Sequence, residues 1–167
     1  MSSLASTVRR DLSPFQQEKI GIIDDTDFSK VAKKVAHDHG FDERYVERGI
    51  LALKQYYAIA VLDPLNMHAV STEVDPFWHT HILFTEDYAE FCQKLVGTYV
   101  HHTPLDEDDS AEVERIKRLY AWTLQSFDEV FERDREFFPD NPDRYVCEHM
   151  NKIYAEQYSE HALFPVQ

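Results

Sequence analysis

The sequence predicts an all-α fold, a single compact bundle of about six or seven helices. The 167 residues include only four glycines, which leaves few positions for hairpin turns and bulges. Apolar residues recur three and four positions apart in several segments, and no long run alternates between apolar and polar residues as a half-buried strand does. Residues 1–12 are expected to form a flexible arm, and residues 13–167 a single helical domain with a histidine-rich motif at 74–104.

Start and stop signals divide the first half of the chain into three helices. Ser13, with Gln16 three residues later, is typical of a capping box and begins the first helix. The second helix is expected to end at Gly40, because glycine adopts the left-handed conformation at little cost. Asp42 can cap a third, longer helix, which Pro64 ends.

The second half alternates between connectors and further helices. Residues 63–70 are interpreted as a linker, followed by a helix that begins near residue 71 and runs to about residue 83. Another helix begins behind Thr85 and is stopped by Gly97. Ser110 is expected to cap a long helix, and Asn141, which precedes a proline, to begin a last one. The apolar residues of this last helix would be Val146, Met150, Ile153 and Tyr154.

The apolar stripes of these helices predict the core. The core residues expected are Ile50, Tyr57, Trp78, His81, Phe91, Cys92, Leu95, Tyr120 and Phe127. The only other cysteine, Cys147, is not spaced from Cys92 as in a CxxC motif, which indicates buried thiols in a reducing compartment. A cytoplasmic protein is therefore expected.

The charge balance is strongly acidic, with 17 Lys and Arg against 31 Asp and Glu and a net charge of -14. Nucleic acids and anionic membranes attract cationic proteins, so the balance argues against both as partners. It fits a protein partner with a basic surface, or solubility alone. The apolar runs are too short to span a bilayer, and the oligomeric state is left open.

The motif at 74–104 contains four of the nine histidines. On a helix, His81 lies on the same stripe as the apolar Trp78 and points inward. His79 points about 160° away from His81, and Asp75 one turn earlier can orient its imidazole. Alternation in an extended chain predicts that only one of His101 and His102 faces the core.

Three functional hypotheses follow from this motif. In the favoured one, the chain is a binding or interaction module whose Trp and His cluster is a buried polar lock, with function carried by the acidic surface. In the second, His81 and His102, with His79 or a carboxylate, bind a divalent metal such as zinc or iron, and an open coordination position would permit hydrolytic or oxidative chemistry. In the third, Asp75 and His79 serve a metal-free enzyme as acid and base.

The run WHTHILFTEDYAEFCQKLVGTYVHHTP resembles the signature of the glycine-rich domain-containing-protein-like family. The matching residues are Asp75, Trp78, His79, His81, Tyr88, Cys92, Gly97, His102 and Pro104. The resemblance implies a helical domain of unknown function and gives no catalytic residues. Plant members join the domain to glycine-rich regions and regions assigned to RNA binding, and an RNA role is not expected for this chain.

Overall fold

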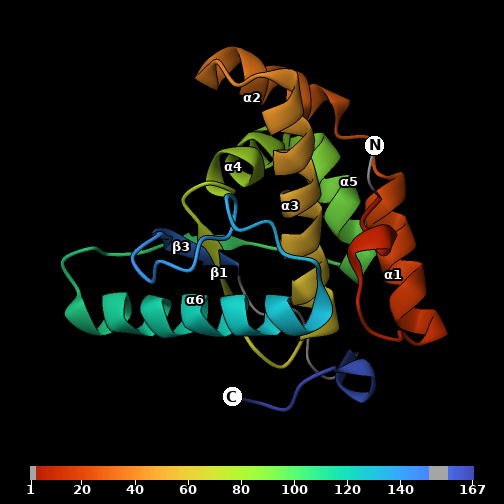
Figure 1. Cartoon of the computed structure of the whole chain (residues 1–167), viewed down its shortest axis with the longest axis vertical. Coiled ribbons are helices and arrows are strands. Elements are labelled where there is room, and N and C mark those ends of the chain that lie inside the picture. The colour runs from red at the N-terminus through yellow and green to blue at the C-terminus, as the bar shows by residue number, and fades with distance from the viewer. Residues whose placement is uncertain (1–2, 151–157) are drawn as a thin grey trace.

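Helix α3 is the central helix of the molecule. A computed structural model describes residues 3–150 and 158–167, with strand residues 146–150 described through their backbone pairing. The α-helices of this part are α1 (Pro14–Asp25), α2 (Ser29–His39), α3 (Glu43–Leu62), α4 (Asp75–Leu83), α5 (Thr85–Val96) and α6 (Ser110–Val130). In Figure 1, α3 stands upright, with α2 above it, α1 and α5 on one side, and α6 crossing its lower end. The predicted helical fold is confirmed.

The predicted ends of the first helices are confirmed by their capping contacts. The Ser13 hydroxyl accepts from the backbone N–H of Gln16 at 3.2 Å, and the Gln16 side chain accepts from the backbone N–H of Ser13 at 2.8 Å. Gly40 and Gly97 end α2 and α5 with φ angles of 69° and 77°, the left-handed values that favour glycine. Asp42 caps α3.

Two expectations about helix starts are wrong. Asp109, not Ser110, caps α6, because its carboxylate accepts from the backbone N–H groups of residues 111 and 112. The helix expected from Asn141 does not form in its described part, because Tyr145–Met150 is a strand, β3. Of the residues assigned to that helix, Val146 and Met150 lie in β3, and Ile153 and Tyr154 lie outside the described residues.

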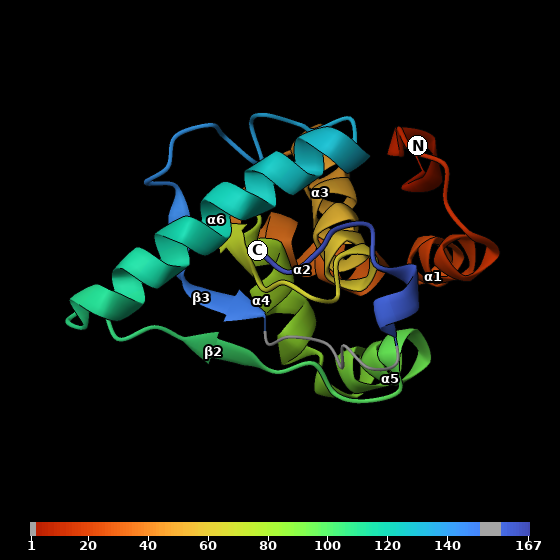
Figure 2. The same ribbon diagram turned by 90° about the horizontal axis from the view of Figure 1, so that it is seen from below.

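Strand β3 is the middle strand of a small antiparallel sheet that the sequence did not predict. Its neighbours are β1 (His68–Ser71), inside the expected linker, and β2 (His102–Pro104). Met150 pairs with His68 on one side and with His102 on the other. α6 packs against β1 and β3, and Figure 2 shows α6 running across the sheet. The sheet thereby fixes the position of His102.

The expected core is confirmed with one exception. Trp78, His81, Phe91, Cys92, Leu95, Tyr57, Tyr120 and Phe127 are all buried. Ile50 is half-buried and lines a surface groove. The described part of the N-terminal segment expected to be a flexible arm is packed: Leu4 is buried, and the backbone N–H of Arg9 donates to the carbonyl of Val130 at 2.8 Å.

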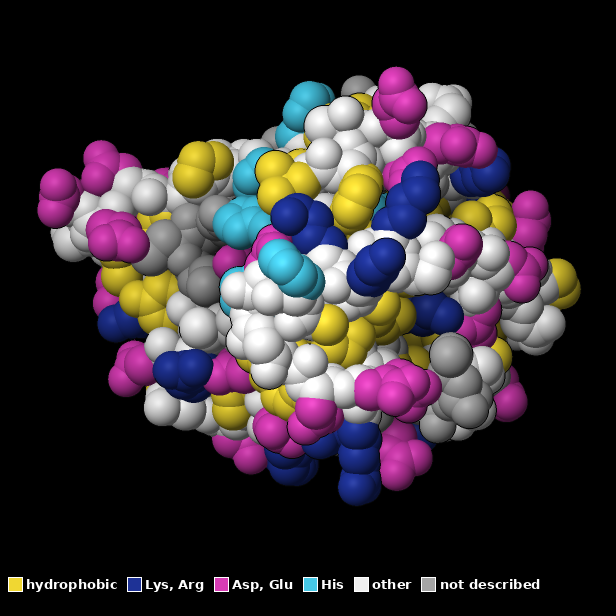
Figure 3. All heavy atoms as spheres, turned by 90° about the horizontal axis from the view of Figure 1, so that it is seen from above, with side chains coloured by type: hydrophobic (Ala, Val, Ile, Leu, Met, Phe, Trp, Pro, Cys, Tyr) yellow, Lys and Arg dark blue, Asp and Glu magenta, His cyan; other side chains and the backbone are white. Residues whose placement is uncertain are grey.

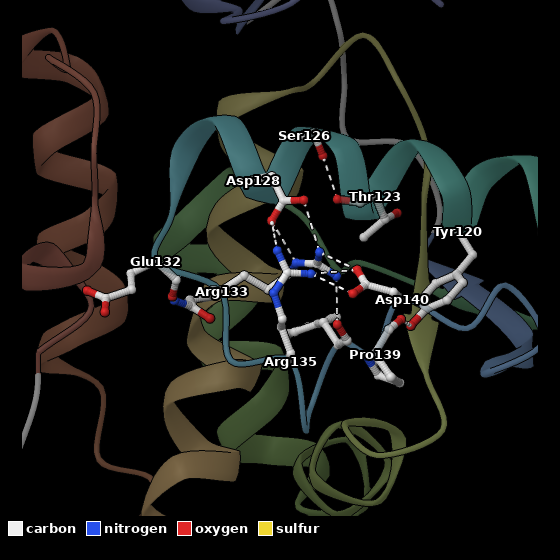
Figure 4. Close-up of polar contacts among 11 residues, drawn as sticks. Tyr120, Thr123, Ser126, Asp128, Glu132, Arg133, Arg135, Pro139 and Asp140 are labelled. Carbon is white, nitrogen blue, oxygen red and sulfur yellow. Dashed lines mark hydrogen bonds and ion pairs between the residues drawn. The ribbon is translucent and has the colours of Figure 1, made fainter.

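Arg133 holds the segment that follows α6. Its guanidinium, only 3% exposed, donates to both carboxylate oxygens of Asp128 at 2.8 and 2.9 Å and to Asp140 at 2.6 Å. It also donates to the carbonyl of Phe138 at 2.7 Å. Figure 4 shows the guanidinium between the two carboxylates, with Arg135 also directed toward Asp140. The Arg133 guanidinium lowers the pKa of Asp140, and the contacts fix the turn that leads to β3.

Candidate functional site

Helix α4 divides the histidine-rich motif between the core and the surface. His81 faces inward and is 2% exposed, as its position on the apolar stripe predicted. The ring centres of Phe28, Tyr88 and Phe91 lie 5.0 to 5.2 Å from that of His81. Its Nδ1 shares a hydrogen bond of 2.6 Å with the Tyr57 hydroxyl. Burial in these surroundings lowers the pKa of His81 to about 4, so the imidazole is neutral at pH 7.

Trp78 lies beside His81 and is fully buried. Its ring contacts Tyr56, with a centroid separation of 5.5 Å. The indole Nε1 is buried and has no hydrogen-bond partner of normal geometry among the described residues. Burial raises the pKa of Tyr88, and the Trp78 indole partly offsets that rise. The Tyr88 hydroxyl is therefore the polar neighbour of the Trp78 indole. Trp78 and His81 together form the buried Trp and His cluster.

His79 lies on the other side of α4, partly exposed and next to Asp75. Its Nδ1 is 3.4 Å from Oδ2 of Asp75, one helical turn earlier. The ring of His102 is half-buried, and its centre lies 5.6 Å from that of His79 and 5.6 Å from that of Trp78. His101 is exposed against Tyr99. The expectation that only one of the two neighbouring histidines faces the protein is confirmed.

The structure therefore brings together two of the three histidines expected to bind metal. His79 and His102 are neighbours, and Asp75 contacts His79. His81 is enclosed by aromatic rings in the core. Within residues 3–150 and 158–167, no group of three or more His, Cys, Asp or Glu side chains is arranged to hold a metal ion. The roles of Asp75 and His79 as acid and base stay predictions.

A buried polar network around Asp63 and His68 was missed by the sequence analysis. His68 Nε2 lies 2.8 Å from Oδ2 of Asp63, and its Nδ1 lies 3.0 Å from the Thr123 hydroxyl. The arrangement of hydroxyl, imidazole and carboxylate is the one that nucleophilic enzymes use. Here all three side chains are buried, and the Thr123 hydroxyl donates to the carbonyl of Leu119 at 2.9 Å. The network is a structural link between the end of α3, β1 and α6.

A groove between α2 and α3 has a volume of about 590 Å³. Its apolar lining is Phe28, Ala32, Ala36, Val46 and Ile50, and its acidic lining is Asp24, Asp27, Glu43 and Glu47. Figure 3 looks at the α2 end of the molecule and shows hydrophobic side chains at the surface with acidic side chains along their border. The groove shares Phe28 with the surroundings of His81.

A second hollow of about 490 Å³ adjoins this groove, because Thr26 and Asp27 line both. Its lining contains four acidic residues and two lysines, and both lysines are paired: Lys30 with Asp87 at 2.9 Å and Lys94 with Glu90 at 2.8 Å. The acidic surface thus extends from the groove along the start of α2.

Comparisons with known proteins identify a family without a known activity. No helix in the described ranges is both long enough and apolar enough to cross a membrane. No curated protein and no solved structure matches the chain significantly. A family model matches residues 18–144, which include most of α1, all of α2 to α6 and the histidine-rich motif. The match does not confirm the resemblance to glycine-rich domain-containing proteins. The chain belongs to the UCP032817-like family, which is uncharacterised.

Proposed function

We propose that this chain is a protein-interaction module whose groove between α2 and α3 binds a basic, amphipathic helix of a partner protein. The observation that carries the proposal is the combination of an apolar floor with an acidic rim. Amphipathic helices bind other proteins by laying an apolar face into such a groove, with anchors one turn apart. The volume of about 590 Å³ is in the range of pockets that hold several side chains.

The floor of the groove has helical spacing on both walls. Ala32 and Ala36 are one turn apart on α2, and Val46 and Ile50 are one turn apart on α3. The alanines are small and leave room that longer side chains would fill. Two rows of apolar side chains at this spacing suit the apolar face of a partner helix that lies between them.

The charges on the rim favour a cationic partner. Asp24, Asp27, Glu43 and Glu47 line the groove together with one lysine, Lys54, which lies 3.4 Å from Asp24. Two lysines of α2 are also engaged in ion pairs, Lys30 with Asp87 and Lys34 with Asp38. Complementary charge steers the encounter and suppresses unsuitable partners. A second copy of this chain would bring its own net charge of -14, so self-association through this surface is disfavoured.

The buried histidine supports the floor of the groove from behind. Phe28 lies in the groove and packs against His81, which Tyr57 holds through a hydrogen bond. A rigid floor reduces the ordering cost of binding. In this proposal the Trp and His cluster is structural, and the acidic groove is the functional surface.

The probe for this function is a synthetic helical peptide of leucine and lysine, with leucines at helical spacing and a fluorophore at one end. A leucine and glutamate peptide of the same pattern is its control. Fluorescence anisotropy at physiological salt should show saturable binding of the leucine and lysine peptide. The leucine and glutamate peptide should show no saturable binding. Ile50→Gln and Glu47→Lys should each weaken it at least about fivefold, or roughly 1 kcal/mol.

Glu107→Lys is the matched control, because it changes the net charge as Glu47→Lys does but lies in the exposed connector before α6. It should change the affinity less than about twofold. Equal weakening by the two charge reversals would mean that the peptide senses only the net charge of the protein. That result, or unchanged binding in Ile50→Gln, would refute the groove as the binding site.

A further inference from the structure

The wall that α3 contributes to the groove differs in charge from one end to the other. Glu43, Glu47, Ile50 and Lys54 follow one another along this wall at helical spacing. Glu43 and Lys54 are about 16 Å apart along the helix axis, at about 1.5 Å per residue, which corresponds to about three turns. The groove therefore has a glutamate end, with Glu43 and Glu47, and a lysine end, with Lys54.

The carboxylates of the glutamate end are open to a partner. Glu43 and Glu47 are both exposed, and no residue that the structure describes forms an ion pair with either of them. Val46 lies between them in the chain, is buried and belongs to the apolar floor. A basic side chain of a partner helix that packs beside Val46 therefore meets two carboxylates one turn apart.

The carboxylate of Asp24, at the lysine end, is already engaged within the protein. Its oxygens accept from the backbone N–H groups of Leu4 and Ala5 at 2.8 and 3.1 Å, and Lys54 Nζ lies 3.4 Å from Oδ1. The same ammonium group lies 5.9 Å from the centre of the Phe28 ring in the floor. The side chain of Lys54 is only 13% exposed, so this cation is held at the floor of the groove. A basic side chain of a partner gains little beside this pair.

Asp27, the second carboxylate at the lysine end, is also partly offset. It accepts from the backbone N–H of Ser29 at 2.9 Å. Hydrogen bonds from Ser29 and, to a smaller degree, the charge of Lys30 lower the pKa of Asp27. Lys54, and in part Lys30, which also pairs with Asp87, thus reduce the negative charge of this end. The glutamate end keeps both of its charges and is the more acidic of the two.

We infer that the partner helix is charge-segregated, with its basic residues at the glutamate end and none on the turn that faces Lys54. The inference rests on the proposed function and makes Lys54 a specificity-determining residue of the groove. Specific interfaces combine attractive contacts with repulsive ones that exclude other partners. Lys54 supplies the repulsive contact, because it disfavours helices that carry basic residues along their whole length.

The test compares two helical peptides of identical composition, stapled so that their helicity is equal, with leucines at the same positions. The segregated peptide has lysines in its first two turns and glutamines in the third, and the distributed peptide has lysines in its first and third turns. In fluorescence anisotropy the wild-type protein should bind the segregated peptide at least about threefold more tightly, the effect of one or two exposed ion pairs. Lys54→Gln should bring the two affinities close together.

Lys117→Gln is the matched control for Lys54→Gln. It also removes the lysine of an ion pair, because Lys117 lies 3.5 Å from Glu114, but it is on α6 and outside the groove. This variant should keep the difference between the two peptides. If Lys117→Gln removed the difference as well, the peptides would be sensing the net charge of the protein, and the role of Lys54 would be refuted.

A second measurement on the wild-type protein covers the case in which Lys54→Gln fails to fold. A nitroxide label at the lysine end of the segregated peptide should broaden the amide signals of residues 43–47 more than those of residues 24–29, and a label at its other end should do the reverse. The opposite pattern, equal affinity of the two peptides, or a difference that Lys54→Gln leaves unchanged overturns the inference while the groove stands as a binding site. If neither peptide binds saturably, the proposed function fails and this inference fails with it.

Discussion

The hydroxyl of Tyr57 lies 2.6 Å from Nδ1 of His81 and joins α3 to α4 inside the core. Both side chains are buried, and burial raises the pKa of Tyr57 well above its ordinary value, so the phenol stays protonated. Because neutral imidazole has one donor and one acceptor nitrogen, this contact satisfies half of the polar capacity of His81. The rest of its surroundings are mainly aromatic.

Tyr57→Phe should therefore lower the free energy of unfolding by about 1–3 kcal/mol, because it leaves a buried imidazole nitrogen without its partner. Urea denaturation followed by circular dichroism measures the change. Tyr99→Phe, at a partly exposed tyrosine, is the control and should have a small effect. In a His81→Leu background the cost of Tyr57→Phe should fall by at least about 0.5 kcal/mol. An unchanged cost would show that the two residues do not interact energetically.

Gly49 allows α4 to approach α3 closely. A Cβ built at Gly49 would lie 2.0 Å from the ring tip of Phe77, which is fully buried and packs between Phe41 and Phe137. In an open helix, Gly→Ala gains about 0.5–1 kcal/mol. At Gly49 the overpacking, which typically costs about 1–3 kcal/mol, should exceed that gain.

Gly49→Ala should thus destabilise the protein, as a lower thermal midpoint in calorimetry would show. Gly21→Ala is the matched control, because Gly21 is also helical but a Cβ there meets nothing within 4 Å. The control should stabilise the protein by about 0.5–1 kcal/mol. If both variants were stabilising, Phe77 would have room to move, and the close approach would not depend on glycine.

Asp63 is the centre of the buried network behind β1. Its carboxylate accepts from Trp122 Nε1 and Asn66 Nδ2, each at 2.8 Å, and lies 2.8 Å from His68 Nε2. Asp63→Asn replaces one acceptor oxygen by a donor group that faces other donors. Loss of one partner from a buried pair costs about 3–5 kcal/mol, so the urea midpoint should fall strongly.

Glu90→Gln is the comparison for that experiment, since Glu90 forms an exposed pair with Lys94 at 2.8 Å. Exposed pairs contribute little, and this variant should unfold close to the wild-type midpoint. A similar small effect in both variants would mean that the Asp63 network does not stabilise the fold.

Local patterns in the sequence predicted most of the helices. They also predicted which histidines of the motif face the protein and which face solvent. Capping residues and glycines determine helix ends within a few positions, so the ends at Gly40 and Gly97 were predictable. The angular position of a residue on a helix decides which side it faces, so His81 was correctly expected inside. Alternation in extended chain likewise distinguished His102 from His101.

Features made by distant segments could not be predicted in this way. β3 pairs with strands far earlier in the chain, and this pairing overrides the helix signal at Asn141. The Asp63 network joins residues up to 59 positions apart. The groove depends on how α2 and α3 are spaced, which made Ile50 appear to be a core residue. Each of these required the tertiary structure.

The last prediction concerns the pH dependence of stability. The pKa of His81 falls from 6.5 to about 4 in the folded protein because burial disfavours the imidazolium, although Asp87 opposes this shift slightly. Between these values the unfolded chain binds a proton at this position and the native protein does not. The free energy of unfolding therefore decreases as the pH falls from about 6.5 to 4, and this contribution levels off below that.

The size of this contribution is on the order of 3 kcal/mol across the whole range. Urea midpoints measured between pH 7 and pH 4.5, with a chelator present, should fall more steeply for wild type than for His81→Gln, because glutamine cannot take up the proton. His37→Gln, at a histidine that is 87% exposed, should keep the wild-type slope. Carboxylates titrate mostly below this range, so the difference between the two variants isolates the buried histidine. Identical slopes for wild type and His81→Gln would mean that the folded protein accepts a proton at His81 as readily as the unfolded chain does, which its enclosure by Phe28, Tyr88 and Phe91 should prevent.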